Sequence, residues 1–126
     1  MEDCTLKNSL IKIEESIVTD QNNPEAHFTY AILLEGSGQY DAAEKEYVKA
    51  TEIKPEFTEA YVHYGNLLKK VSRYGDAETQ YRKAITISPA NYHARIGYAQ
   101  LLEEQKRFEE AEEEYYHAVE ARSVNK

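Results

Sequence analysis

The chain has 126 residues, 30% of them charged, with only 5 glycines, 3 prolines and a formal net charge of −8. This length suits a single domain, and the scarcity of glycine and proline favours helices. The negative charge argues against a general binder of nucleic acids or anionic membranes, because their phosphate groups carry the same sign.

The sequence shows no sign of membrane insertion or secretion. No segment approaches the ~18 consecutive apolar residues of a transmembrane helix. Residues 1–4 are acidic and do not begin the basic and then apolar pattern of a signal peptide. The single cysteine, Cys4, excludes an internal disulfide and a multi-cysteine metal site. We therefore expect a cytoplasmic protein.

The first predicted element is a helix over residues 5–19. Its apolar residues share one helical face, at i, i+4, i+7 and i+11: Leu6, Leu10, Ile13 and Ile17. Because this helix precedes the repeated part of the chain, we expect residues 1–23 to form an N-terminal capping helix.

From residue 24 onward the same residue types recur at a spacing of 34 residues. The matches include Ala26, Ala60 and Ala94, then Tyr30, Tyr64 and Tyr98, the leucine pairs 33–34, 67–68 and 101–102, and finally Tyr47, Tyr81 and Tyr115. A fixed spacing of this length is the signature of a repeat architecture. We expect three units, at residues 24–57, 58–91 and 92–126.

Each unit predicts two amphipathic helices. In the first unit the apolar stripes are Ala26, Tyr30, Leu33 and Leu34 for one helix, and Ala43, Tyr47 and Ala50 for the other. Pro55 and Pro89 end the second helices of the first two units, because proline cannot continue the hydrogen-bond ladder.

The helix boundaries are marked most clearly in the first unit. Asn23 followed by Pro24 predicts an N-cap and a first turn, and the glycines of residues 36–39 separate the two helices. The matching segments 71–73 and 105–107 contain no obvious helix breaker.

Small residues recur where the paired helices are expected to approach closely. The predicted facing pairs are Ala31 with Ala43, Gly65 with Ala77 and Ala99 with Ala111. Without bulk at these points two antiparallel helices can come together, and the tyrosines and leucines fill the space on either side.

This pattern resembles the tetratricopeptide repeat family over residues 24 to about 122. The resemblance implies an all-α fold, an α-solenoid in which antiparallel helix pairs form a right-handed superhelix. It also implies a non-catalytic scaffold for protein–protein interaction. The sequence departs from the family at two places. The large residue expected three positions before the recurrent tyrosine is present as Tyr61 in the second unit, but the first and third units have His27 and Arg95 there. Ser123 stands where the third closing proline is expected.

In this family the first helices of successive repeats line a concave groove, which implies a peptide-binding site there. The predicted groove residues are Phe28, Ile32, Val62, His63, Asn66, Lys69, Lys70, His93, Ile96 and Gln100. They suit an extended or helical segment of a partner protein with apolar anchors and an acidic flank near Lys69 and Lys70. In the alternative, Phe28, Val62 and Ile96 pack between the first helices of adjacent repeats.

The groove does not match that of the chaperone-binding members of the family. Those members hold a carboxylate with lysine, asparagine and arginine side chains. The same positions here are Phe28, Ile32, His63, His93 and Gly97. The resemblance therefore does not imply an Hsp70 or Hsp90 co-chaperone.

A second hypothesis assigns the chain a structural role. Tyr115, Tyr116 and Val119 lie among acidic residues on the final predicted helix, where a following helix would ordinarily cover part of the surface. This face, or the groove, could join copies of the chain into a homo-oligomer. A head-to-tail contact would build open arrays, and a two-fold contact would stop at a dimer.

Nothing in the sequence points to an enzyme or to a cofactor. It contains no glycine-rich phosphate loop, no HExxH motif and no nucleophile elbow. Glu59, His63 and His93 could share a face and hold a metal ion, but solvated polar groups explain the same pattern, and we expect no metal site. Most of the 11 tyrosines fill recurrent core positions, which argues against base stacking on nucleic acid.

Overall fold

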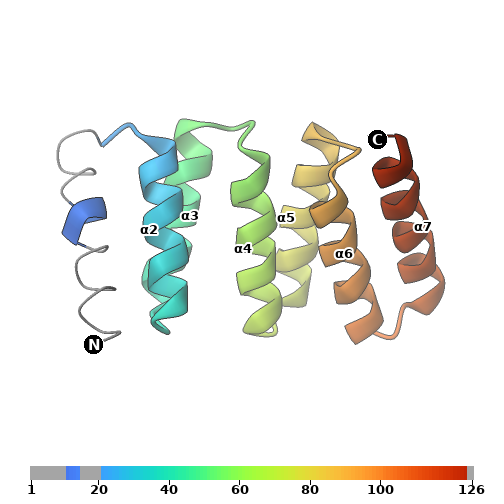
Figure 1. Ribbon diagram of the computed structural model, residues 1–126. Coiled ribbons are helices and arrows are strands. Elements are labelled where there is room, and N and C mark those ends of the chain that lie inside the picture. The colour runs from blue at the N-terminus through green and yellow to red at the C-terminus, as the bar shows by residue number, and fades with distance from the viewer. Residues whose placement is uncertain (1–10, 15–20, 125–126) are drawn as a thin grey trace, which may run out of the picture. The chain divides into compact units, whose positions relative to one another are not determined.

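The computed structural model describes residues 11–14 and 21–124, and every regular element among them is an α-helix (Figure 1). Residues 11–14 are helical, and the rest of the helix predicted over residues 5–19 lies outside the described ranges. The chain divides into two compact units, Met1–Ala60 and Tyr61–Lys126, and each has its own core.

In the first unit, α2 (Pro24–Gly36) and α3 (Tyr40–Ile53) lie side by side (Figure 1). The start of α2 is confirmed, because Asn23 Oδ1 accepts a hydrogen bond from the backbone N–H of Ala26 at 3.1 Å and Pro24 occupies the first turn. Ala43 and Tyr47 are fully buried, as their places on the apolar stripe predict, and so is Ala31, the small residue predicted to face Ala43.

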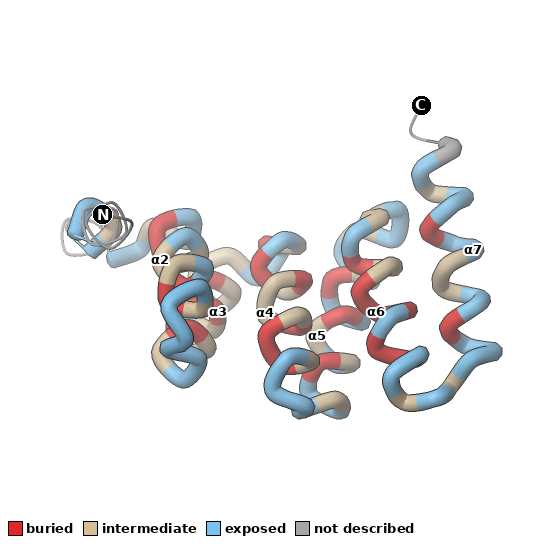
Figure 2. Tube along the Cα trace, turned by 60° about the horizontal axis from the view of Figure 1, so that its bottom comes forward, coloured by how far each residue is buried: buried red, intermediate tan, exposed pale blue. Residues whose placement is uncertain are grey.

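The second unit holds most of α4 (Thr58–Lys70), followed by α5 (Tyr74–Ile87), α6 (Tyr92–Glu104) and α7 (Phe108–Val124). α6 packs against α5 on one side and against α7 on the other (Figure 1). The main core cluster consists of Leu68, Ala77, Tyr81, Tyr98, Leu101, Leu102 and Ala111. In Figure 2 the buried positions of α7 lie on its side toward α6, whereas its outer side is exposed.

The turns that end α2, α4 and α6 share one geometry. Gly38, Ser72 and Lys106 occupy the same repeat position and have φ angles of 83°, 65° and 62°, in the left-handed region. The next residue in each turn donates its N–H to a leucine carbonyl of the preceding helix at 2.8–2.9 Å: Gln39 to Leu34, Arg73 to Leu68 and Arg107 to Leu102. These bonds form a Schellman cap, which normally places glycine at the left-handed position. Ser72 and Lys106 therefore carry backbone strain that Gly38 avoids.

Tyr81 lies buried between two glycines, Gly65 on α4 and Gly97 on α6. A Cβ atom added to Gly65 would stand 2.9 Å from the ring of Tyr81, and one added to Gly97 would stand 2.6 Å from it. Gly65, which the sequence predicts to face Ala77, has the Tyr81 ring as the nearest neighbour of an added Cβ. The glycines admit an aromatic ring, in addition to permitting close backbone approach.

The two side chains that depart from the repeat pattern each have a carboxylate partner. His27 Nδ1 lies 2.6 Å from Glu46 Oε1, and both side chains are buried. Arg95 Nη1 lies 2.9 Å from Glu114 Oε1. The two glutamates occupy the same repeat position on the second helix of each pair. A polar residue on the first helix is therefore compensated by a charge on the second.

Candidate binding site

Two of the predicted groove residues, Phe28 and Ile32, belong to the first unit. Phe28 is half-buried, and its ring centroid lies 4.9 Å from that of Phe57 and 6.2 Å from that of Tyr47. Ile32 is exposed. Phe28 thus contributes to the core of its own unit, through Tyr47 of α3 and Phe57 in the segment after α3.

The other eight lie in the second unit, and one of them is a core residue. Val62 is only 5% exposed and clusters with Ala84 and Ala94. Its assignment to the groove surface is therefore corrected, because the side chain faces inward. His63 and Ile96 are half-buried, and His93 is exposed on α6 next to Tyr92.

An open hollow of about 510 Å³ brings several predicted residues together at the C-terminal ends of α4 and α6. Its lining consists of Asn66, Lys69, Lys70, Ser72, Tyr74 and Glu104. Lys69 Nζ also donates a hydrogen bond to Gln100 Oε1 at 3.1 Å, which joins the two helices at the edge of the hollow. Three predicted groove residues thus line one hollow, and a fourth contacts it.

The two lysines at this hollow differ in their exposure to solvent. Lys69 is half-buried and Lys70 is exposed. Burial lowers the pKa of Lys69, and the nearby carboxylate of Glu104 opposes that shift. The ammonium group of Lys69 is therefore poorly solvated, and its hydrogen-bond partner Gln100 is neutral. An anionic group would stabilise this ammonium better than the amide does, because charge-assisted hydrogen bonds are about twice as strong as neutral ones.

The presence of lysine at position 69 changes the hydrogen bonding of the core. In the other two helix pairs the matching tyrosine donates to a glutamate: Tyr47 to Glu35 at 2.8 Å, and Tyr115 to Glu103. Lys69 replaces that glutamate in the middle pair, and the hydroxyl of Tyr81 donates to Asn66 Oδ1 instead. The amide oxygen of Asn66 is thereby occupied, whereas its NH₂ group remains a donor at the hollow.

Sequence reasoning did not identify Ser72 and Tyr74 as lining residues. Ser72 is the left-handed residue of the turn, and Tyr74 opens α5. Neither residue lies on the first helix of a repeat, and the family resemblance predicts groove residues only on first helices. Position 72 corresponds to Gly38 in the 34-residue repeat. This correspondence indicates a turn beside the end of α4.

The residues proposed for self-association separate onto two sides of α7. Tyr115 packs against the core cluster and donates its hydroxyl to Glu103, so that it faces α6. Burial and then this hydrogen bond raise the pKa of Tyr115 to about 12. Tyr116 and Val119 are 62% and 63% exposed. Only these two belong to the outer face.

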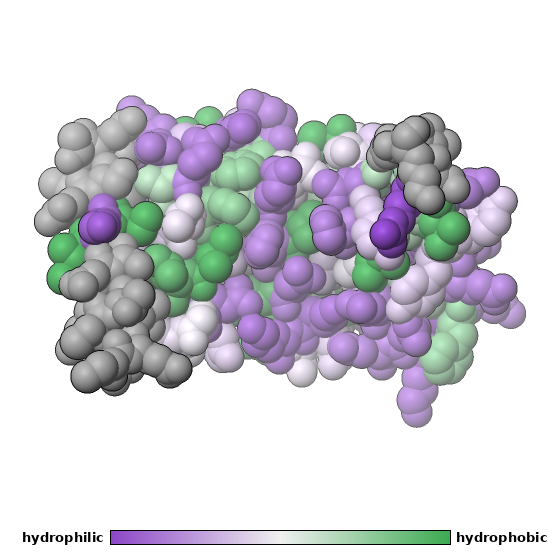
Figure 3. Space-filling model, viewed as in Figure 1, coloured by the Kyte–Doolittle hydropathy of each residue, from purple (hydrophilic) through white to green (hydrophobic). Residues whose placement is uncertain are grey.

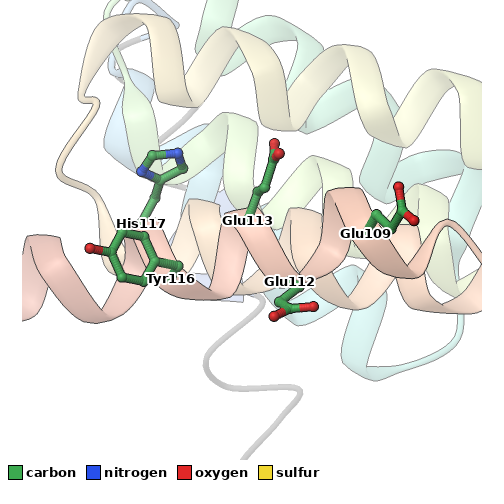
Figure 4. Close-up of a pocket in the computed structure, with 5 residues that line it drawn as sticks. All are labelled: Glu109, Glu112, Glu113, Tyr116 and His117. Atoms are coloured by element: carbon green, nitrogen blue, oxygen red, sulfur yellow. The ribbon is translucent and has the colours of Figure 1, made fainter.

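The outer face of α7 bears a second open cavity, of about 630 Å³ (Figure 4). All of its lining side chains come from α7 itself: Glu109, Glu112, Glu113, Tyr116 and His117. They recur at helical spacing along the exposed side. Polar side chains also dominate the face of α6 and α7 seen in Figure 3, with separate apolar groups among them.

Two further expectations concern metals and membranes. Among the described residues no group of three or more His, Cys, Asp and Glu side chains is placed to hold a metal ion, so that Glu59, His63 and His93 are not gathered into one. Within the same ranges no helix has the length and apolar character needed to cross a membrane.

Comparison with solved structures identifies the fold. A crystal structure of MamA superposes with a TM-score of 0.88 at 18% identity, over 95% of this chain and 70% of that one. A second MamA structure, MSR-1 C2, gives 0.81 at 19% identity over 99% and 72%. MamA from residue 41 onward of Desulfovibrio magneticus RS-1 gives 0.80 at 22% identity over 92% and 66%. At these identities the likeness concerns the fold alone, and it confirms an all-α solenoid.

Comparison of sequences identifies the family. No curated protein sequence gives a significant match. Two family models, both described as tetratricopeptide repeat, match residues 13–45 and 68–122. These matches fall on both units and agree with the structural likeness. The chain therefore belongs to the tetratricopeptide repeat family, whose fold is that of a protein–protein interaction scaffold.

Proposed function

We propose that this scaffold is non-catalytic and binds a peptide segment of a partner protein at the hollow lined by Asn66, Lys69 and Lys70. The observation that carries the proposal is Lys69 itself. It is a half-buried cation whose hydrogen-bond partner is neutral, in a protein with a net charge of −8. Such a group favours an acidic ligand, because a carboxylate replaces the amide of Gln100 with a full negative charge.

The surroundings of Lys69 suit a peptide. The NH₂ group of Asn66 can donate to a main-chain carbonyl, and Lys70 extends the positive surface outward. Ile96, half-buried on α6, offers an apolar contact on the same helix as Gln100. Glu104 also lines the hollow and repels a second negative charge there. We therefore expect a segment with one acidic residue and an apolar neighbour, in preference to a polyanion.

The proposal is tested by selecting random peptides displayed on phage against the immobilised chain and measuring the enriched peptides by fluorescence anisotropy. Lys69→Glu with Lys70→Glu should weaken the enriched peptides by about tenfold or more, since an attractive charge pair becomes repulsive. Lys45→Glu is the matched control, because Lys45 is exposed on α3 in the first unit. Enriched peptides that lack acidic residues, or an affinity unchanged by the double reversal, would place the binding site elsewhere.

A further inference from the structure

α6, the first helix of its pair, is held against α5, the second helix of the preceding pair, by specific side-chain contacts. The hydroxyl of Tyr98 donates to Glu78 Oε2 at 2.6 Å, and Arg107, in the turn after α6, lies 3.3 Å from Glu78 Oε1. Ile85 supplies the apolar contact nearby, packed against the main core cluster. One carboxylate thus receives a tyrosine and an arginine from the docked helix and its turn.

The outer face of α7 carries two of these groups one repeat later. Glu112 stands at the position of Glu78, and Val119 stands at the position of Ile85. Both are exposed, and no partner of the Glu112 carboxylate lies among the described residues. Tyr116 occupies the position of Arg82, which in α5 pairs with Glu78 at 3.0 Å and donates to the hydroxyl of Tyr98 at 3.2 Å. The face therefore has an acceptor and an apolar contact in the register that α5 uses, with a tyrosine in place of that arginine.

The charge of this face indicates the character of its occupant. The cavity of about 630 Å³ that runs along it is lined by three glutamates and has His117 as its single basic side chain (Figure 4). A docked helix must bring positive charge, because burying glutamates against a neutral or acidic surface would leave them without compensation.

We propose that the outer face of α7 docks a basic amphipathic helix of a partner protein, which presents a tyrosine and an arginine to Glu112 as Tyr98 and Arg107 are presented to Glu78. This surface lies on a different helix from the hollow at Lys69, so the two proposals are independent.

A second copy of this chain fits the face less well than a basic partner does. The tyrosine of α2 that matches Tyr98 is Tyr30, and its hydroxyl already donates to Glu14 Oε1 at 3.1 Å. Gln39 stands where Arg107 would be required. Two copies would also each bring a net charge of −8.

The test uses this chain's own docking element as the probe. The probe is a fluorescent peptide with the sequence of residues 92–107 and the substitution Gln100→Lys. A lactam bridge between that lysine and Glu104, four residues later, holds the peptide helical. Circular dichroism verifies the helix before the full chain is titrated into the peptide and anisotropy is followed. Saturable binding is expected. Since the peptide is already helical, an absence of binding would overturn the proposal.

Two variants and one control place the peptide on the face. Glu112→Gln should weaken binding by about tenfold or more, as expected for loss of hydrogen bonds to a charged group, and Val119→Asp should weaken it similarly. Glu52→Gln removes the same charge from an exposed position on α3 in the first unit and should change the affinity less than about twofold. Equal losses for Glu112→Gln and Glu52→Gln would indicate a diffuse charge effect and overturn the proposal.

A substitution in the peptide, combined with Glu112→Gln in the chain, forms a double-mutant cycle. Tyr98→Phe in the peptide should weaken binding to the unaltered chain and should have little further effect on the Glu112→Gln variant, because both changes remove the same hydrogen bond. Additive losses would refute the pairing of that tyrosine with Glu112.

Light scattering tests whether a second copy of the chain, instead of a partner protein, occupies this face. The chain alone should remain a monomer over a wide concentration range. A dimer or larger species that Tyr116→Glu with Val119→Glu dissociates would identify a second copy as the occupant and overturn the proposed partner helix.

Discussion

The close contact around Tyr81 gives a sharp stability prediction for Gly97→Ala. The new Cβ would lie 2.6 Å from the ring, well inside the ordinary carbon–carbon contact of about 3.5 Å. The ring cannot retreat, because Tyr81 is completely buried and its hydroxyl is bonded to Asn66. Overpacking of this kind costs about 1–3 kcal/mol, and this short distance places it near the upper end. Alanine recovers about 1 kcal/mol of helix propensity, so we expect a net loss of about 2 kcal/mol.

Urea unfolding followed by the helical circular dichroism signal measures this loss. In a Tyr81→Leu background the ring is absent, and Gly97→Ala should become neutral or stabilise by up to about 1 kcal/mol. Gly75→Ala is the matched control: Gly75 is exposed on α5, no atom lies within 4 Å of an added Cβ, and no destabilisation is expected. A Gly97→Ala variant as stable as the unaltered chain would refute the inference that the ring is fixed.

Three further predictions follow from the turns and the charge pairs. Ser72→Gly and Lys106→Gly should each stabilise the chain by about 0.5–1 kcal/mol in urea unfolding, because glycine relieves the left-handed strain. Glu78→Gln should destabilise by about 2 kcal/mol at neutral pH, since the carboxylate accepts charge-assisted bonds. Burial by itself raises the pKa of Glu78, but hydrogen bonds from Tyr98 and Arg107 outweigh it and lower the pKa below its ordinary 4.5. Its stabilisation is therefore complete above pH 4.5 and disappears as the pH falls through the lower folded-state pKa, so the two unfolding curves should converge in acid. Glu46→Ala should destabilise by about 2 kcal/mol, because it leaves Nδ1 of the buried His27 without its hydrogen-bond partner, and a thermal unfolding midpoint unchanged from the parent would contradict that account.

Residue periodicity was sufficient to predict the buried helix faces, because most of the recurring alanine, tyrosine and leucine positions are buried. It was insufficient for the turns after α4 and α6. Ser72 and Lys106 carry no helix-breaking signal of their own, and their left-handed conformation follows from the hydrogen bonds of the cap. The pairing of His27 with Glu46 was also missed, since it depends on two docked helices and not on spacing within one.

The candidate hollow was predicted in part for a similar reason. Asn66, Lys69 and Lys70 lie where the family resemblance indicates, on the first helix of a pair. Tyr74 comes from the second helix, and only the docked arrangement brings it to the rim. Val62 was misplaced because an apolar residue on a groove-facing position and one between packed helices have the same sequence signature.

The lysine at position 69, where the flanking helix pairs have glutamate, leaves the interior of its own pair with a complete set of hydrogen bonds. In the flanking helix pairs this position is committed to the core, where Glu35 and Glu103 accept a tyrosine hydroxyl. In the middle pair the acceptor role passes to Asn66, and Lys69 donates to Gln100 at the edge of the hollow. Reversal of Lys69 to glutamate therefore restores the internal acceptor while it removes the external cation. Loss of ligand by that variant can be read as loss of recognition, because the core of the repeat keeps a partner for Tyr81 in either form.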